Sequence, residues 1–450
     1  MKATAAMSAG NSFIPQRVLV TKFRHHGDVL LTTPLIRALH HYYPGVEVDA
    51  LIYRETEDML RHNPQVAHRW TIDRNWKKEG ARAHIKHEWR LWRALKARHY
   101  DLLIHLTESW RGAALARGLS VMRSIAFDYP RRENLFWRHS FTDLAPLPEK
   151  PCHNVALQLS ALIALGLTPT AEDFPLSLSV DEAARTAFLS ALRRAGWQGE
   201  PYLLIHPGAR WFFKCWEDAS FAALIDALIV RGHTIVLTGA PDARETAMVA
   251  NILARLKDKA RVHSLVGQLS LAELAAAIAS AQFFIGVDSV PMHMAAALQI
   301  PGVALFGPSK VHEWSPWQAP ITVLKASDWT TLPHPDSINT ATTTRYLAAI
   351  PVEAVLEAVV ARQRSARSQA PSGNLSHVKA ERKNLTTKNT KKSNRKKHKE
   401  KLFTRRREER GEKTVNYAKV TKKLPNSPGA RASRPHPSPR TPRLRVKWFF

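Results

Sequence analysis

The sequence of 450 residues contains only two cysteines, Cys152 and Cys215. Two cysteines so far apart provide neither a disulfide framework nor the spacing of a zinc site, which fits a reducing compartment. Residues 1–16 carry one lysine and no apolar core, so they do not resemble a signal peptide. The chain also has no run of about 18 apolar residues that could span a membrane. The sequence therefore predicts a soluble, cytoplasmic protein.

Several catalytic signatures are absent as well. The sequence has no Walker A loop and no Gly-x-Ser-x-Gly motif, which argues against P-loop nucleotide hydrolysis and α/β-hydrolase chemistry. It also has no Asp-x-Asp pair, so a sugar nucleotide held through a metal ion has no evident ligand set.

Acidic residues are scarce only at one end of the chain. The formal net charge is +28, but residues 361–450 hold 28 Lys and Arg against 5 Asp and Glu, whereas residues 1–360 hold 38 against 33. The globular part is thus mildly basic and gives little support for nucleic-acid binding. Residues 364–450 are rich in Lys, Arg, Pro and Ser and poor in apolar residues, which predicts a disordered basic tail. Such a tail either adheres to anionic lipid or nucleic acid or has no selected role.

What the chain does have is a regular alternation of strand-like and helix-like segments. This pattern predicts an α/β protein with two Rossmann-like, doubly wound parallel sheets that face each other across a cleft. The expected strands are 17–23, 46–53, 101–107, 123–128, 202–209, 234–240, 283–289 and 302–308, and the expected helices are 34–44, 154–167, 219–232, 271–281 and 291–299.

We expect four parts along the chain: an N-terminal domain over residues 15–170, a C-terminal domain over 171–345, a helix over 346–363 and the tail over 364–450. In open α/β sheets, ligands bind beyond the carboxyl ends of the strands. That rule directs attention to the turns after residues 23, 107, 208, 239, 288 and 307.

The loop after the first predicted strand contains one carboxylate among basic residues, in the stretch KFRHHGDVLLTTP (22–34). Asp28 follows Gly27 near the start of a helix. Asp is a preferred helix N-cap, so capping is one interpretation. The alternative is that Asp28 acts as a general base at the mouth of the cleft.

Two loops of the second half are suited to binding an anion. Lys214, in HPGARWFFKCW (206–216), is either a solvated loop lysine or a point charge for a diphosphate. In FFIGVDSVPMHMAAAL (283–298), Asp288 and Ser289 end a strand and a helix starts around Pro291, where proline suits the first turn. Backbone N–H groups at that helix start can bind phosphate, with His293 in the first turn, although ordinary capping also explains the pattern.

Two further segments carry candidate contacts. In LTGAPDARE (237–245), Asp242 or Glu245 could hold a ribose, or could be helix-start acids favoured by the helix dipole. In 77–101, Ile85, Trp89, Trp92 and Leu95 share one helix face, which predicts a surface helix with a buried stripe. The alternative is a face directed at anionic lipid or a phosphorylated saccharide. Residues 131–139 add Arg131, Arg132, Arg138 and His139 to the basic groups of the first half.

Taken together, these motifs resemble the lipopolysaccharide core heptosyltransferases, glycosyltransferase family 9, over about residues 15–360. KFRHHGDVLLTTPLI is similar to the family's N-terminal strand–loop–helix, and GVDSVPMHMAAAL followed by GVALFGPS is similar to its donor-binding signature. The paired His25-His26, VDALIYRETEDML, LTESW and YPRRENLFWRHSF are similar to the heptosyltransferase III branch, which adds a side-branch heptose to the second heptose of the inner core.

The resemblance implies the two-domain GT-B fold and an inverting transfer from ADP-L-glycero-β-D-manno-heptose, without metal or cofactor. It implies that Asp28 is the general base. Lys214, Asp242, Asp288, Ser289, Val290 and His293 are expected to bind the donor, and Lys22, Arg24, Arg131 and Arg132 the acidic acceptor, the lipopolysaccharide inner core. Because that acceptor lies in the inner leaflet, the enzyme is expected at the cytoplasmic face of the inner membrane, as a peripheral protein with no nucleic-acid partner.

Two alternatives stay open from the sequence. One is a GT-B transferase or epimerase that uses another nucleotide sugar. The other is a basic nucleic-acid-binding protein, which rests on the charge alone. The heptose contacts are also open, because Ser289-Val290-Pro291-Met292 replaces the Thr-Gly-Leu-Ser of the first-heptose enzymes, and His25-His26 has no derived role.

Overall fold

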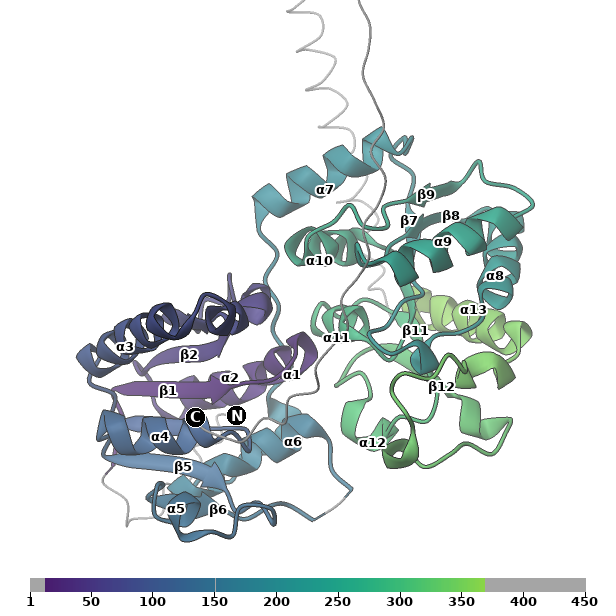
Figure 1. The fold of residues 1–450 in the computed structure, drawn as a ribbon. Coiled ribbons are helices and arrows are strands. Elements are labelled where there is room, and N and C mark those ends of the chain that lie inside the picture. Colours follow the sequence, from purple (N-terminus) through teal and green to yellow (C-terminus); the bar gives the residue numbers. More distant parts are fainter. Residues whose placement is uncertain (1–12, 150, 369–450) are drawn as a thin grey trace, which may run out of the picture. The chain divides into compact units, whose positions relative to one another are not determined.

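The structure is a computed structural model that describes residues 13–149 and 151–368. The first half of the chain forms one parallel sheet in the order β3-β2-β1-β4-β5-β6 (Figure 1). Its strands are β1 (Arg17–Lys22), β2 (Glu47–Tyr53), β3 (His68–Ile72), β4 (Leu102–His105), β5 (Arg123–Phe127) and β6 (Asp143–Ala145).

The second half forms another parallel sheet in the order β12-β11-β10-β7-β8-β9. Its strands are β7 (Tyr202–His206), β8 (Thr234–Leu237), β9 (Val262–Ser264), β10 (Phe283–Val287), β11 (Gly302–Phe306) and β12 (Ile321–Lys325). In each sheet the chain starts at a central strand, moves to one edge, and returns to the other side of that strand. This is the doubly wound Rossmann order, so the predicted fold class is confirmed.

Helices connect the strands in both halves. They are α1 (His26–Leu30), α2 (Thr33–Tyr42), α3 (Ala81–Ala97), α4 (Trp110–Leu119), α5 (Leu135–Arg138), α6 (Asn154–Leu159), α7 (Glu182–Arg194), α8 (Asp218–Val230), α9 (Ala243–Arg255), α10 (Leu271–Ser280), α11 (Val290–Ala297), α12 (Val311–Trp314) and α13 (Val352–Ser368).

Two of these helices differ from the sequence prediction. The segment 154–167 is not one long helix, because α6 ends at Leu159 and continues as a 3₁₀ helix, Ser160–Leu165, that stops at Gly166 with φ of 76°. The C-terminal helix α13 starts at Val352 and reaches Ser368, so 364–368 are helical although they belong to the range expected to be disordered. The rest of the expected tail lies outside the described residues.

The central strands are buried on both faces, as parallel sheets require. Along β1, Val18 and Val20 belong to one apolar cluster and Leu19 belongs to another. In the second sheet, Leu203 and Leu204 of β7 separate in the same way. The continuous apolar run that predicted each strand therefore results from packing of helices against both faces.

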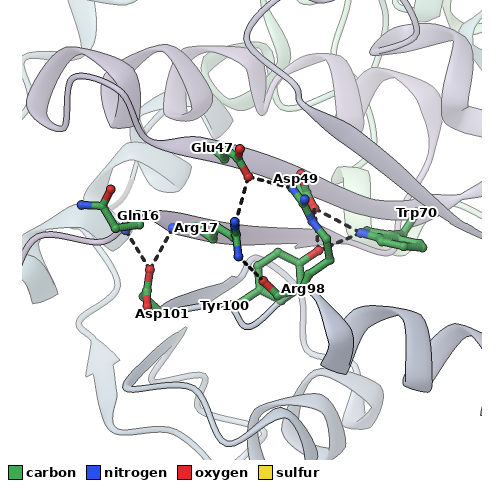
Figure 2. Close-up of polar contacts among 8 residues, drawn as sticks. All are labelled: Gln16, Arg17, Glu47, Asp49, Trp70, Arg98, Tyr100 and Asp101. Carbon is green, nitrogen blue, oxygen red and sulfur yellow. Dashed lines mark hydrogen bonds and ion pairs between the residues drawn. The ribbon is translucent and has the colours of Figure 1, made fainter.

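A buried carboxylate lies near the amino end of the first sheet, away from the loops that carry the predicted site. Figure 2 shows Asp49 of β2 surrounded by donors from β3 and from the segment that leads into β4. Its side chain has no exposed surface and accepts hydrogen bonds from Arg98 Nε at 2.9 Å, Tyr100 OH at 2.6 Å and Trp70 Nε1 at 3.3 Å. Burial and the adjacent Asp49 raise the pKa of Tyr100. These hydrogen bonds link β2 to β3 and to the segment that leads into β4.

Candidate functional site

A cavity of about 1000 Å³ lies beyond the carboxyl ends of strands from both sheets. The loops that follow β1 and β4 line it from the first half, and those that follow β7 and β10 line it from the second. In each sheet these two strands are neighbours at the point where the strand order reverses. Ligands of doubly wound sheets bind at this point, so the fold itself marks the cavity as the site.

Nine of the eleven residues predicted for the site line this cavity. They are Lys22, Arg24, Asp28, Arg131, Lys214, Asp288, Ser289, Val290 and His293. Arg132 and Asp242 are not among the lining residues.

Asp28 occupies the third position of the short helix α1, and His25 is the N-cap. Its Oδ2 accepts a long hydrogen bond of 3.4 Å from the backbone N–H of His25, as in a capping box. Asp28 also lines the cavity, with 17% of its side chain exposed. Asp28 is therefore not the N-cap that one interpretation expected, because His25 holds that position. Its carboxylate accepts the capping-box bond from the third helical position and still lines the cavity.

Lys22, the last residue of β1, lies beside this carboxylate. Its Nζ is 4.0 Å from Asp28 Oδ1 and donates a hydrogen bond to Leu106 O at 3.3 Å. Burial lowers the pKa of Lys22 to about 8, although the charge of Asp28 opposes the shift. The amine is therefore mostly protonated at pH 7 and loses its charge as the pH rises through about 8.

In the second half, Lys214 and Asp288 form a buried ion pair. Nζ lies 2.5 Å from Oδ2, and the two side chains are 15% and 6% exposed. Lys214 ends a short 3₁₀ helix after β7, and Asp288 directly follows β10. The pair holds an ammonium group at the cavity wall next to the start of α11.

Two buried polar atoms of residues that line the cavity, Ser289 Oγ and His293 Nδ1, have no hydrogen-bond partner among the described residues. Buried polar groups in native proteins are nearly always paired, so these two atoms are available to bind a polar ligand. Burial lowers the pKa of His293 to about 4, despite the opposing charge of Asp288, so the ring is neutral at pH 7. It can then donate one hydrogen bond and accept another.

The loops of the two halves come into close contact at Gly27 and His293. A β-carbon at Gly27 would lie 3.2 Å from His293 Cδ2. That separation is tighter than ordinary van der Waals contact, so glycine is the residue that fits there. This contact fixes the position of α1, which carries the predicted base, relative to α11, which carries predicted donor-binding residues.

The pair His25-His26 divides between two environments. His25 lines the cavity, and Arg210 Nη1 lies 2.7 Å from its ring nitrogens. Burial, together with the charge of Arg210, lowers the pKa of His25. Burial also lowers the pKa of His26, which interacts with the backbone of Glu55 and its charge. The first histidine therefore belongs to the site, and the second contacts the segment after β2.

The predicted acceptor arginines also take different places. Arg24 and Arg131 line the cavity. Arg132 instead donates from Nε to Glu108 O at 2.9 Å, and its guanidinium lies 4.5 Å from the centre of the Trp110 ring. Arg132 thus fixes the loop that carries Arg131 instead of facing the cavity.

The two acids proposed for a ribose are distinguished by the structure. Asp242 is the N-cap of α9 and accepts hydrogen bonds from the N–H groups of Arg244 at 3.0 Å and Glu245 at 3.2 Å. The carboxylate of Glu245 is buried and accepts a bond of 2.7 Å from Ala240 N, just after β8. Burial raises the pKa of Glu245. Capping accounts for Asp242, whereas Glu245 lies at the strand ends.

Some residues that line the cavity were not predicted from the sequence. Trp211 is one of them, and Lys214 Nζ lies 5.0 Å from its ring centre. Tyr129 follows β5, lines the cavity as well, and was not singled out. The loop-after-strand rule could have identified Tyr129 had it been applied to the strand at 123–128.

The buried stripe expected on the helix in 77–101 is only partly correct. Leu95 is fully buried, but Ile85 and Trp89 are 66% and 54% exposed. Helix α3 therefore turns part of its apolar face outward, which leaves the alternative of an interaction surface open.

Two classes of feature are absent from the described part of the chain. Residues 13–149 and 151–368 contain no group of three His, Cys, Asp or Glu side chains arranged to hold a metal ion. Over the same residues, no helix combines the length and apolarity needed to cross a bilayer.

Comparison with known proteins gives consistent matches. Residues 88–340 match the model of glycosyltransferase family 9 (heptosyltransferase). The chain is 38% identical over 336 residues to lipopolysaccharide heptosyltransferase 3 of Escherichia coli, a match that covers 75% of this chain and 96% of that protein.

Solved structures share the fold. A family 9 glycosyltransferase of Veillonella parvula superposes with a TM-score of 0.66 at 23% identity and covers 78% of this chain and 97% of its own. The E. coli ADP-heptose lipopolysaccharide heptosyltransferase II does so with a TM-score of 0.63 at 22% identity, over 78% and 99%. At these identities, the solved structures support the fold alone.

Proposed function

The chain belongs to glycosyltransferase family 9, the heptosyltransferases, and has their GT-B fold; on this basis we propose that it transfers L-glycero-D-manno-heptose from ADP-heptose to the inner core of lipopolysaccharide. The extent of the match to a heptosyltransferase 3 supports the side-branch heptose, added to the second heptose, as the group transferred. One observation carries the proposal: Asp28 and the face formed by Lys214 and the start of α11 line the same cavity.

The reaction we propose is an inverting single displacement. Asp28 accepts the proton of the acceptor hydroxyl as its oxygen attacks the anomeric carbon of the heptose, because a neutral hydroxyl is a poor nucleophile. The bond from that carbon to the phosphate oxygen breaks on the opposite side, and ADP leaves with the electron pair. Inversion follows because attack and departure occur on opposite faces of the sugar.

The second half supplies the positive field for the leaving group. Lys214 and the backbone N–H groups at the start of α11 can stabilise the charge that develops on the diphosphate. Asp288 holds the ammonium of Lys214 at 2.5 Å. Loss of one such donor commonly lowers kcat by about 10²–10³. These groups come from the protein itself, in keeping with metal-independent transfer.

The remaining donor contacts are assigned by position. Ser289 Oγ and His293 Nδ1 are buried without a partner among the described residues and are suited to bind the diphosphate or heptose hydroxyls. For the ribose we favour Glu245 over Asp242, since Asp242 already caps α9. A buried carboxylate that accepts ribose hydroxyls is a recurrent feature of Rossmann sheets.

The first half provides for an acidic acceptor. Lys22, Arg24 and Arg131 line the cavity from this side, and Lys22 and Arg24 are close to Asp28 in the chain. Guanidinium groups pair well with carboxylates and phosphates, the charged groups of the inner core. We place the enzyme at the cytoplasmic face of the inner membrane, where such an acceptor is anchored.

The proposal is tested with purified full-length protein, ADP-heptose and core acceptors that either contain or lack the side-branch heptose. We expect mass spectrometry to detect one added heptose on the acceptor that lacks the branch and none on the acceptor that already has it. Equal transfer to a core that lacks the second heptose would contradict the side-branch assignment. Transfer from a UDP-sugar but not from ADP-heptose would contradict the donor.

A further inference from the structure

We propose that an exposed surface of the first half, the basic aromatic surface, docks onto anionic lipid. It consists of the outward face of α3, Trp110 at the start of α4, and Leu135 and Phe136 of α5. The proposal extends the proposed function, in that it gives the means by which a lipid-anchored acceptor is approached.

The outward face of α3 contains only basic and apolar side chains. Its large exposed residues recur at helical spacing and are Arg82, Ile85, Lys86, Trp89, Arg90, Arg93 and Lys96. The guanidinium of Arg93 lies 4.6 Å from the centre of the Trp89 ring. Helices that lie in a membrane interface combine apolar and aromatic residues with Lys and Arg in this manner.

Helix α5 and the start of α4 continue the same character. Leu135 and Phe136 are 73% and 49% exposed, and Trp110 is 37% exposed with its ring 5.9 Å from that of Phe136. The guanidinium of Arg117 lies 5.5 Å from the centre of the Phe136 ring. Leu135 and Phe136 do not contribute to the core. The residue of α5 that does is Trp137, whose side chain is fully buried.

Helices α3 and α4 are joined by an ion pair, which also neutralises the single acidic residue of α3. Arg111 of α4 forms a bidentate pair with Glu88 at 2.5 and 2.8 Å. His84 also lies 3.3 Å from this carboxylate. The only carboxylate between residues 81 and 97 is therefore neutralised within the protein, and the outward face of α3 is left cationic.

Charge and chemistry favour lipid over a protein partner. An anionic headgroup layer offers a continuous negative surface for Lys and Arg, while the acyl boundary accepts Trp, Phe, Leu and Ile side chains. Each cationic side chain can extend to the headgroups as its stem stays on apolar surface. The surface also continues toward the cavity, because Arg131, which lines the cavity, lies four residues before Leu135.

The first test measures vesicle binding of the full-length chain, with phosphatidylglycerol and phosphatidylethanolamine vesicles at low and high salt. The variant replaces Ile85, Trp89, Leu135 and Phe136 with serine and leaves every charge unchanged. We expect at least a tenfold loss of binding at high salt, where electrostatic attraction by other basic segments is screened. A matched control replaces Val230 and Trp329, exposed apolar residues of the second half, and should bind as the unmodified chain does.

Binding of the fourfold variant at the level of the unmodified chain, at both salt concentrations, would overturn the proposal. Transfer to a water-soluble core oligosaccharide is measured in parallel and should be unchanged. Failure of the docking proposal and failure of the proposed enzyme activity are then seen in separate readouts.

A second measurement needs no variant and covers the case in which the substitutions unfold the chain. Hydrogen exchange of the unmodified protein is compared with and without vesicles. We expect slower exchange in 81–97 and 131–138 and no change in 218–230. Protection that is confined to other segments would show that the basic aromatic surface does not contact lipid, and would overturn the proposal.

Discussion

At the scale of single residues, Asp28 combines a role in local structure with a place at the cavity, where we propose that it acts as the general base. Its hydrogen bond to the N–H of His25 fixes the start of α1, while the carboxylate remains at the cavity. From the sequence, capping and catalysis were competing interpretations. The two interpretations competed because a sequence does not show how the two oxygens of the Asp28 carboxylate are oriented.

The Asp28→Asn variant separates the two roles. The amide oxygen can still accept the backbone hydrogen bond, but it cannot take a proton. We expect kcat to fall by about 10²–10⁴. The midpoint of thermal unfolding without ligand should stay nearly the same, and so should its rise on addition of ADP. Steady-state kinetics and thermal shift measure these quantities, and a variant that keeps normal turnover would contradict the assignment of the base.

Lys22 predicts a pH dependence of stability. Its pKa is about 8 in the folded chain and ordinarily 10.5, so between these values the unfolded chain binds more protons. The free energy of unfolding therefore gains a contribution that rises with pH from about 8 to 10.5. Below pH 8 the buried ammonium reduces stability by about 3 kcal/mol at most.

The Lys22→Met variant should thus be more stable than the unmodified chain at pH 7, with an advantage that disappears as the pH approaches 10.5. Urea denaturation at several pH values measures it. The same variant should have a higher KM for the acidic acceptor. A stability difference that does not vary with pH would contradict the burial of a charged amine.

At the scale of elements, the sequence predicted the eight inner strands of the two sheets and missed the four edge strands. These are β3, β6, β9 and β12. The helix expected at 154–167 breaks after Leu159, although its residues have good helix propensity. Tertiary packing decides such cases, and propensity is only a weak prior.

The contact between α1 and α11 predicts coupling between the segment proposed to carry the base and the segment proposed to bind the donor. Gly27→Ala should displace the His293 ring by a few tenths of an ångström, and we expect kcat/KM to fall roughly tenfold. In a His293→Ala background, where the ring is absent, the same substitution should cost little. The four enzymes form a double-mutant cycle, for which we expect a coupling energy of about 1 kcal/mol. Additive effects would mean that the two positions act independently.

Substitution of Asp49 is expected to reduce stability without affecting substrate binding. Asp49→Asn removes the charge that balances Arg98, and we expect a loss of roughly 3–5 kcal/mol in the free energy of unfolding. Glu47→Gln is a matched control, because Glu47 pairs with the same arginine but is about half exposed. That substitution should cost less than about 1 kcal/mol. The KM for ADP-heptose should be unchanged in both variants, as the cluster lies at the amino end of the sheet.

At the scale of the whole molecule, the sequence predicted two α/β domains in tandem, because apolar strand segments alternate with helical segments in both halves of the chain. The cavity that joins them was predictable only as a rule about strand ends. Nine of the eleven residues expected at the site line that cavity. The rule could not separate Asp242 from Glu245, since which acid caps a helix depends on how α9 starts relative to β8.

The distribution of charge predicts that the basic C-terminal segment is dispensable for chemistry. Residues 361–450 contribute +23 of the net +28, and 336 residues, 75% of this chain, align with 96% of the E. coli heptosyltransferase 3. A chain that ends at residue 370 should retain kcat and KM on a water-soluble core acceptor. Its binding to anionic vesicles should weaken at low salt but remain at high salt, where apolar contacts dominate over long-range attraction. Activity measurements and vesicle sedimentation of both chains check this, and a loss of transfer in the shorter chain would show that the segment takes part in catalysis or folding.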